Sequence, residues 1–201
     1  MVITAPAGCG KTHSGASLAD DVASRLHRGR VLVLTHTHAA RVVFADRTRS
    51  HGDRVEVRTF DGFVDSIARP YHASLSLPAD PAKWAMERPK DGFRTLSEKV
   101  AGLLDSSPMI RDALVARYPV IICDEHQDTN SGQFKVAESL MQAGAKLRVF
   151  GDPMQMIYAD DEDGGARWAE LENAGLAETL NTPYRWRNGS PALGDWILEA
   201  R

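Results

Sequence analysis

Five consecutive residues near the start of the chain have the types and the order that bind phosphate. The segment Gly8-Cys-Gly-Lys-Thr12 follows a short apolar run, Val2-Ile3, and precedes a stretch with helical spacing. Backbone N–H groups in such a loop, and at the start of the next helix, form a concave positive site for phosphate oxygens. The lysine of this pattern reaches the β- and γ-phosphates of a nucleotide, and the hydroxyl after it binds Mg²⁺. The sequence therefore predicts a phosphate-binding loop, although the strict pattern has glycine where Ala5 stands.

Two adjacent carboxylates, Asp124 and Glu125, follow the apolar run Val120-Ile-Ile-Cys123. Such a run is typical of a strand buried on both faces of a parallel sheet, and ligands bind such sheets at the carboxyl ends of the strands. Beside a phosphate loop, the first carboxylate suits the Mg²⁺ shell and the second suits polarising a water. Taken alone, the pair is more often two solvated acids that end a strand. The alternative for the loop is a plain small-residue turn. The occurrence of both patterns in one chain favours the chemical interpretation.

The elements that must position these residues alternate between strands and helices. Further strands are predicted at 31–34, 55–59, 147–150 and 178–180, and helices at 14–26, 131–142 and 191–198. The order strand, loop, helix, strand, helix at the start of the chain predicts an α/β fold, with a parallel sheet and right-handed crossovers.

One segment interrupts this alternation. Residues 70–89 contain four prolines, which break the periodicity, and two amphipathic stretches follow at 93–104 and 109–118. We predict one α/β domain formed by residues 1–69 and 119–201, with a short, mostly helical insertion at 70–118.

The composition limits the classes of protein. The 201 residues are 43% hydrophobic, which suits one domain with a sizeable core. Lys and Arg number 24 against 27 Asp and Glu, so the net charge of −3 argues against broad coating of nucleic acid but not against a local groove. Two cysteines are too few for a disulfide framework and indicate a reducing, cytoplasmic compartment. The sequence shows no signal-peptide pattern and no apolar run long enough for a membrane span, so no membrane partner is expected.

Six segments resemble, in the expected order, the motifs of one family: the first RecA-like domain of superfamily 1A DNA helicases of the UvrD, Rep and PcrA type. The most specific is Asp124-Glu-His-Gln-Asp-Thr-Asn130, which is close to the D-E-x-Q-D-T-N pattern of motif II. The other five are Ala5–Thr12 (motif I), Leu34–Ala40 (Ia), Thr59–Phe63 (Ib), Gly151–Tyr158 (III) and Asn181–Arg185 (IV). The resemblance covers nearly the whole chain and implies a P-loop NTPase with a RecA-like fold, in which 70–118 would be a reduced form of the family's 1B insertion.

The resemblance also implies ATP and Mg²⁺ as cofactors and a role for each matching residue. Lys11 would hold phosphate, Thr12 would hold Mg²⁺, and Asp124 would lie in the coordination shell of the same Mg²⁺. Glu125 would activate the attacking water, Gln155 would sense the γ-phosphate, and Arg185 would touch it. Nucleotide would contact the loop and two later residues: Ala7, Gly8, Cys9, Gly10, Lys11, Thr12, His13, Tyr184 and Arg185. Single-stranded DNA would contact Thr35, His36, His38, Thr59 and Phe60.

The chain departs from the family's pattern in several places. Motif Ia carries His36 and His38 in place of the usual aromatic residue and Asn. Two histidines at this spacing could bind zinc, but the sequence offers no third or fourth ligand for such a site. Four acids occur within 159–163, where the family has a Trp-Arg pair that meets DNA; Arg167 and Trp168 are an alternative for that contact. The sequence ends after motif IV. We therefore expect a truncated chain that needs a second RecA-like domain, in cis or in trans, and that has little activity alone.

The sequence thus predicts the ATP-binding and ATP-hydrolysing domain of a DNA helicase or translocase that acts on single-stranded or partly duplex DNA, in a setting such as DNA repair. The alternative is a nucleotide-gated binding module of a larger assembly, without motor activity of its own. A small-molecule P-loop kinase is a third interpretation, and it is disfavoured because kinases do not need Gln127 and Asp128 at these positions.

Overall fold

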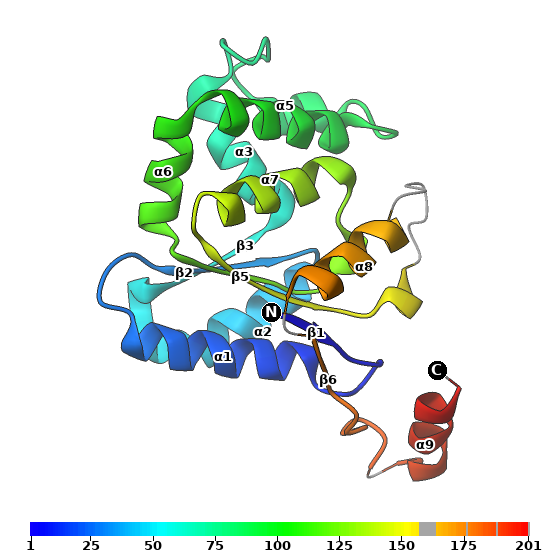
Figure 1. Cartoon of the computed structure of the whole chain (residues 1–201). Helices are drawn as coiled ribbons and strands as arrows, with labels where there is room; N and C mark the ends of the chain where they lie inside the picture. Colours follow the sequence, from blue (N-terminus) through cyan, green and yellow to red (C-terminus); the bar gives the residue numbers. More distant parts are fainter. Residues whose placement is uncertain (157–163, 176, 188, 201) are drawn as a thin grey trace.

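The computed structural model describes residues 1–156, 164–175, 177–187 and 189–200 (Figure 1). These residues form six strands: β1 (Val2–Thr4), β2 (Val31–Thr35), β3 (Val55–Thr59), β4 (Val120–Cys123), β5 (Lys146–Gly151) and β6 (Ala177–Thr179). The strands make one sheet in the order β3-β2-β4-β5-β1-β6, and every adjacent pair is parallel. The predicted α/β fold with a RecA-like parallel sheet is therefore confirmed.

Helices cover both faces of the sheet. The α-helices among the described residues are α1 (Lys11–Arg25), α2 (His38–Arg47), α3 (Phe60–Ala68), α4 (Pro81–Met86), α5 (Gly92–Ser106), α6 (Pro108–Arg117), α7 (Ser131–Gln142), α8 (Gly164–Ala174) and α9 (Pro191–Glu199). Short 3₁₀ turns are η1 (Arg49–Arg54), η2 (Arg69–Tyr71), η3 (His126–Asp128) and η4 (Pro153–Gln155). In Figure 1, α1 and α2 lie below the sheet, and α3, α5, α6 and α7 lie above it. No helix in the described ranges is both long and apolar enough to cross a membrane.

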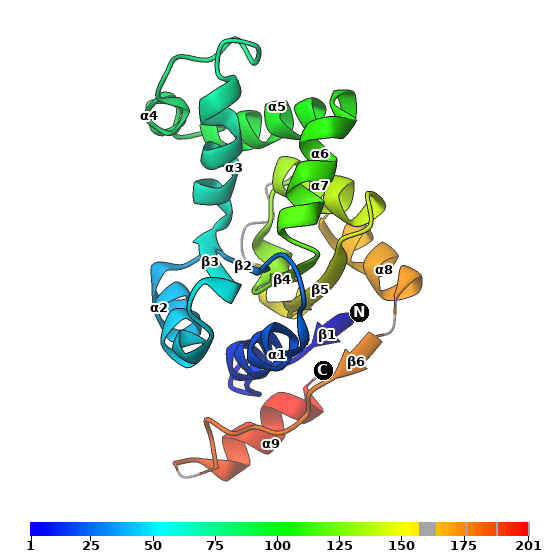
Figure 2. The same cartoon turned by 90° about the vertical axis from the view of Figure 1, so that its left-hand side faces the viewer.

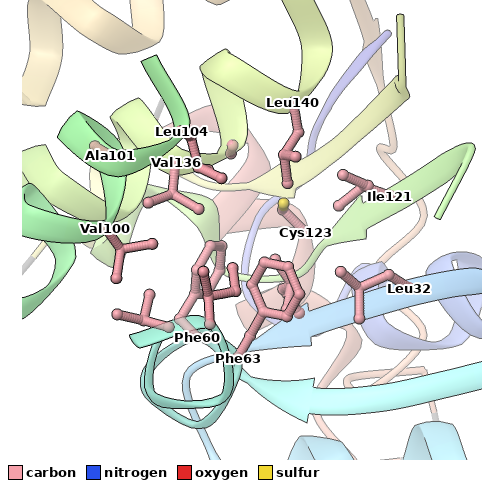
Figure 3. Close-up of a cluster of buried hydrophobic side chains, with 14 of the residues drawn as sticks. Leu32, Phe60, Phe63, Val100, Ala101, Leu104, Ile121, Cys123, Val136 and Leu140 are labelled. Atoms are coloured by element: carbon pink, nitrogen blue, oxygen red, sulfur yellow. The ribbon is translucent and has the colours of Figure 1, made fainter. Parts of the chain in front are cut away.

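The central strands are apolar along their whole length because each of their faces meets a helical layer. Successive residues of a strand point to opposite faces, and in β4 the side chains of Ile121 and Cys123 join one buried cluster, while Val120 and Ile122 join the other. Figure 3 shows the first cluster, in which Leu32, Ile121 and Cys123 of the sheet face side chains from α3, α5 and α7. Burial on both faces explains why the sequence of each central strand is a continuous apolar run, from which the strand can be predicted.

The segment from 70 to 118 contains α4, α5 and α6, together with most of the turn η2. Helix α5 lies directly against α7, and the contact is so close that a Cβ added at Gly132 would come within 2.6 Å of the backbone nitrogen of Glu98. Helix α4 was not foreseen; it starts where Asp80 accepts a hydrogen bond from the backbone of Lys83 and where Pro81 fills the first helical position. Because Leu96, Val100 and Leu104 of α5 belong to the same cluster as the sheet residues, these helices share the main core. The division of the chain into two domains stays a prediction.

The sheet order brings three polar segments to one edge. Strand β5 lies between β4 and β1, so all three strands end side by side. The loop before α1 follows β1, Asp124 and Glu125 follow β4, and Asp152 follows β5. The fold therefore assembles the predicted site from residues far apart in the sequence.

Candidate functional site

The loop between β1 and α1 has the backbone shape of an anion site. Gly8 and Gly10 adopt left-handed φ values of 80° and 84°, which glycine tolerates without strain. Helix α1 begins directly after Gly10, with no side chain capping its first turn and no acidic residue in that turn. The N–H groups of the first turn of a helix have no partner within the helix and carry a partial positive charge, so the end of α1 favours a negatively charged ligand.

Lys11 and Thr12 of this turn meet the two carboxylates that follow β4. The Lys11 ammonium donates a hydrogen bond to the Ala5 carbonyl at 3.1 Å and lies 3.7 Å from Oε2 of Glu125. The Thr12 hydroxyl donates to Oδ2 of Asp124 at 3.2 Å. Two segments that are more than a hundred residues apart in sequence thus form one polar cluster, as the sequence predicts.

The oxygens of Thr12 and Asp124 fit a hard divalent cation. Asp124 is 1% exposed, and its other oxygen, Oδ1, is buried without a hydrogen-bond partner. A buried carboxylate oxygen without a partner is costly, and a cation would satisfy it. No group of three or more His, Cys, Asp or Glu side chains in the described ranges could hold a metal. A pair of protein oxygens matches Mg²⁺, which is typically bound through one or two carboxylates together with waters and phosphates.

Glu125 is held in an uncommon backbone conformation. Its φ of 50° lies in the left-handed region, where residues other than glycine are strained. Strand β4 ends at Cys123, and the backbone N–H of Asp124, just before Glu125, still donates to the carbonyl of Leu34 at 2.8 Å. The side chain of Gln127 donates to Oε2 of Glu125 at 3.0 Å. The backbone and the side chain together fix the Glu125 carboxylate beside Lys11.

A chain of hydrogen bonds connects Glu125 with Gln155. Gln127 donates to Glu125 and accepts, through Oε1, a hydrogen bond from the backbone N–H of Asp152 at 3.1 Å. The Gln155 amide contacts the Asp152 carboxylate, and its backbone N–H donates to the Asp152 carbonyl at 2.9 Å. Asp152 is 0% exposed and Gln127 is 8% exposed, so the chain runs through the interior. Gln127 is therefore the residue that ties motif II to the end of β5.

Burial changes the proton affinity of these acids. It raises the pKa of Asp124 to about 7, with a further contribution from the charge of Glu125, against the opposing effects of Thr12 and Lys11. Burial and the same glutamate raise the pKa of Asp128 to about 6. Three clustered carboxylates with one nearby lysine carry an excess of negative charge, and a cation would relieve it.

The raised pKa of Asp124 predicts how the stability of the ligand-free chain depends on pH. Because the folded pKa of about 7 exceeds the ordinary value of 3.8, the folded state keeps a proton that the unfolded state has lost between these values. The contribution of Asp124 to folding is thus greatest at low pH and is lost as the pH rises to about 7. We expect Asp124→Asn to reduce the fall in unfolding free energy between pH 5 and pH 8 by on the order of 2 kcal/mol.

The measurement is urea denaturation at both pH values, without nucleotide or Mg²⁺. Asp112→Asn is the matched control, because Asp112 is exposed on α6. Equal pH dependence in Asp124→Asn and in the unchanged chain would contradict the assignment.

The segment 184–186 lies against the loop. The backbone N–H of Arg185 donates to the Gly8 carbonyl at 3.2 Å, and the Trp186 indole donates to the Ala7 carbonyl at 3.4 Å. Tyr184 lies beside Gly10 with 59% of its surface exposed, and the Arg187 guanidinium stacks 4.8 Å from the centre of its ring. The structure thus brings Tyr184 and Arg185 to the loop. The sequence does not predict the contact between Trp186 and Ala7. The only signal for it in the sequence is that Trp186 follows Arg185.

The residues predicted to contact DNA divide into buried and exposed groups. Thr35 is 0% exposed and Phe60 is 1% exposed, while His38 is exposed at the start of α2. The Thr59 hydroxyl caps α3 by accepting a hydrogen bond from the N–H of Gly62 at 3.1 Å. His36 stacks on Phe60 with ring centres 4.8 Å apart, and burial lowers its pKa to about 4. The side chains of Thr35 and Phe60 thus lie beneath the surface at the carboxyl ends of β2 and β3.

The ring of His126 was not foreseen as part of this region. It lies 6.1 Å from Phe60 and 5.8 Å from Phe134, and its ring nitrogens are buried without hydrogen-bond partners. Burial lowers the pKa of His126 to about 3, so the ring is neutral and takes the place of an apolar aromatic side chain. A buried, mainly aromatic column therefore connects the segments after β2, β3 and β4.

Three further expectations concern the periphery of the site. His13 is exposed and contacts Arg47. Trp168 is 4% exposed, and its indole donates to Glu172 at 2.9 Å, so it is a core residue and does not offer a surface for DNA. Arg167 stacks on Phe134, 5.6 Å from its ring centre. The predictions for Tyr158 and for the acids at 159–163 lie outside the described residues.

Comparison with known proteins gives consistent matches. Residues 82–160 match the sequence model of the UvrD/REP helicase N-terminal domain. The RecBCD enzyme subunit RecB of Mycobacterium tuberculosis (strain CDC 1551 / Oshkosh) is 32% identical over 99 residues, which are 48% of this chain and 9% of that protein. The same subunit of Escherichia coli (strain K12) is 26% identical over 126 residues, 57% of this chain and 11% of that protein. DNA helicase II of Haemophilus influenzae is 30% identical over 107 residues, 50% of this chain and 14% of that protein.

The chain therefore matches only 9% to 14% of the length of these three relatives. The matched segments, the all-parallel sheet of six strands and the ordered motifs nevertheless agree with one another. These matches support a similarity to the N-terminal, RecA-like domains of UvrD/Rep-type superfamily 1A helicases.

Proposed function

We propose that this chain binds ATP with Mg²⁺ and hydrolyses it, as the N-terminal motor domain of a DNA helicase or translocase that acts on single-stranded DNA. The observation that carries the proposal is the meeting of Lys11 and Thr12, from the start of α1, with Asp124 and Glu125, from the end of β4. An uncapped helix N-terminus, a buried lysine and two carboxylates at one sheet edge suit phosphoryl transfer to water.

Each side chain has a defined task in this mechanism. The first turn of α1 and the Lys11 ammonium hold the phosphate oxygens, and Thr12 and Asp124 hold Mg²⁺, which neutralises phosphate charge when bound. Glu125 accepts a proton from the attacking water, whose oxygen bonds to the γ-phosphorus as the bond to the β-phosphate oxygen breaks. The products are ADP and inorganic phosphate. The hydrogen bond from Gln127 keeps the Glu125 carboxylate in place for this step.

Tyr184 and Arg185 complete the nucleotide site in this proposal. The Tyr184 side chain is largely exposed beside the loop, which suits stacking on adenine. Arg185 is exposed, and its backbone is anchored to Gly8, so its guanidinium can swing toward the γ-phosphate. A second RecA-like domain, in cis or in trans, would close over this side.

The same proposal accounts for coupling to DNA. The hydrogen-bonded chain from Glu125 through Gln127 and Asp152 to Gln155 would transmit the state of the γ-phosphate. The exposed His38 lies at the neighbouring edge, after β2, where DNA would bind. The stacked rings of His36, Phe60 and His126 lie between this edge and motif II, and two sites connected by a packed network can exchange binding free energy.

The test is steady-state ATP turnover of the 201-residue chain, with and without a single-stranded oligonucleotide. We expect the oligonucleotide to raise turnover by about tenfold, a typical size for coupling between sites. His38→Ala should reduce this stimulation and leave the affinity for ATP unchanged. The control is His27→Ala, because His27 is exposed beyond the opposite end of α1.

Equal effects of the two histidine changes would contradict the DNA site. ATP binding without turnover, even with DNA and with a second RecA-like domain supplied in trans, would instead favour a nucleotide-gated binding module.

A further inference from the structure

A groove lies on the side of the molecule away from the nucleotide site, between α3 and α6. Its apolar floor consists of Phe63 and Ile67 from α3 and Ile110 and Leu114 from α6, and its volume is about 430 Å³. Figure 2 looks onto this side, with α3 above β3 and α6 to the right of α3. Helix α6 leads into the amino end of β4, whereas the nucleotide site lies at the carboxyl end of that strand.

The groove continues into a second hollow of about 650 Å³. The two hollows share Tyr71 and Ile110, and the second extends past Leu75 and Leu103 toward Lys99 of α5. Tyr71 is 36% exposed at the junction, so an aromatic face is open to a ligand in the middle of the groove. The two hollows therefore form one surface whose shared residues are apolar, while five serines line the rest: Ser66, Ser74, Ser76, Ser106 and Ser107.

Cations lie at both ends of this groove. Arg58 and Arg117 line one end, Lys99 lines the other, and none of the residues described as lining either hollow is acidic. At the first end, Glu56 accepts hydrogen bonds from Arg58 at 2.6 Å and from Arg117 at 3.1 Å, and it pairs with Arg30 at 3.3 Å. One carboxylate against three guanidinium groups leaves a positive excess.

These cations are held in place before any ligand arrives. Glu56 is ionised because hydrogen bonds from Tyr118 and Arg58, outweighing the effect of its burial, lower its pKa to about 2. The Lys99 ammonium donates to the carbonyl of Leu75 at 2.9 Å. Side chains that are already ordered lose less conformational entropy when they bind, which favours recognition.

The distribution of charge decides between two classes of ligand. A nucleic-acid strand carries a phosphate at every nucleotide and needs cations along its whole path. The middle of this groove offers Tyr71, Ile110 and Leu103 and no cation. A peptide with apolar side chains in the middle and carboxylates at both ends matches the groove in both polarity and charge.

We propose that the groove between α3, α5 and α6 is a docking site for an acidic, amphipathic peptide segment of a partner protein. The apolar side chains of that segment would lie on the exposed parts of Tyr71, Ile110 and Leu114. Its carboxylates would meet Arg58 and Arg117 at one end and Lys99 at the other. The groove shares no lining residue with the Lys11–Glu125 cluster, so docking can be tested without nucleotide.

The test uses fluorescence anisotropy with the 201-residue chain. The probes are labelled peptides of about ten residues, the length of α6, with leucine and phenylalanine in the middle and glutamate at both ends. Matched peptides carry glutamine in place of glutamate, and a single-stranded oligothymidylate of similar length is the nucleic-acid probe. We expect the acidic peptides to bind about tenfold more tightly than the glutamine peptides.

Two substitutions on one helix locate the binding. Ala113 is exposed on α6 and lines the groove, whereas Ala116 is exposed on the same helix and does not. Ala113→Glu puts a carboxylate into the groove and should weaken the binding of the acidic peptides by about tenfold. Ala116→Glu should leave their affinity unchanged. Gly102→Glu, at an exposed position in the second hollow with no atom within 4 Å of a Cβ, should act like Ala113→Glu.

The outcomes are distinct. If no acidic peptide binds, or if Ala113→Glu and Gly102→Glu leave binding unchanged, the docking site is refuted. If oligothymidylate binds and is the probe weakened by these two changes, the groove is a nucleic-acid site and the peptide assignment is wrong. None of these results depends on ATP turnover.

Discussion

Replacement of Glu125 with glutamine is expected to lower ATP turnover by about 10²–10⁴-fold, the typical contribution of a general base. The amide has nearly the same shape as the carboxylate and cannot accept the proton of the attacking water. Gln127 and Lys11, which hold the Glu125 side chain, both remain in the variant. ATP affinity should therefore change little, because the phosphate-holding turn of α1 is untouched.

The measurement combines steady-state turnover with equilibrium binding of a fluorescent ATP analogue. Glu138→Gln is the control, since Glu138 lies on α7 outside the Lys11 cluster. Turnover in Glu125→Gln within about twofold of the unchanged chain would contradict the role of Glu125 as general base. Loss of nucleotide binding in this variant would show that Glu125 acts in binding instead.

Replacement of Lys11 with methionine is expected to weaken ATP binding by about 100-fold, equivalent to about 3 kcal/mol. Lys11 is 6% exposed, so its ammonium interacts with a phosphate in a poorly solvated setting where charge-assisted hydrogen bonds are strong. The same ammonium lowers the pKa values of Asp124 and Asp128. Its removal leaves the carboxylates without that cation, which makes the site repel phosphate.

Isothermal titration calorimetry with ATP and Mg²⁺ measures the change. Lys135→Met is the matched control, because Lys135 is exposed on α7. Thermal unfolding of both variants checks that they fold. If Lys11→Met bound ATP as tightly as Lys135→Met did, the loop before α1 would not be the nucleotide site.

The local chemistry of the chain determined the strands, most helices and the identity of the central cluster. Strand β2 is readable because Val31–Thr35 is buried on both faces, so every position is apolar or a buried threonine. The start of α1 can be predicted because glycine, lysine and threonine in that order are typical of a phosphate-binding loop that leads into a helix. The short helix α4 escaped detection because a six-residue helix contains too few turns for a periodic pattern.

Only the tertiary structure decided which distant residues share contacts. The order β4-β5-β1 places Asp152 where Gln127 can join it to Glu125, and no periodicity in the sequence encodes that sheet order. Packing also decided that Thr35 and Phe60 are buried, and that the Trp186 indole reaches the Ala7 carbonyl.

The groove between α3, α5 and α6 arises in the same way, from the side chains that three helices bring together. The sequence by itself thus determined the elements and the chemical groups of this protein, because periodicity and turn chemistry act over a few neighbouring residues. The pairing of strands and the packing of helices decided the hydrogen-bonded network, the buried rings and the groove, because these depend on contacts between segments far apart in the chain.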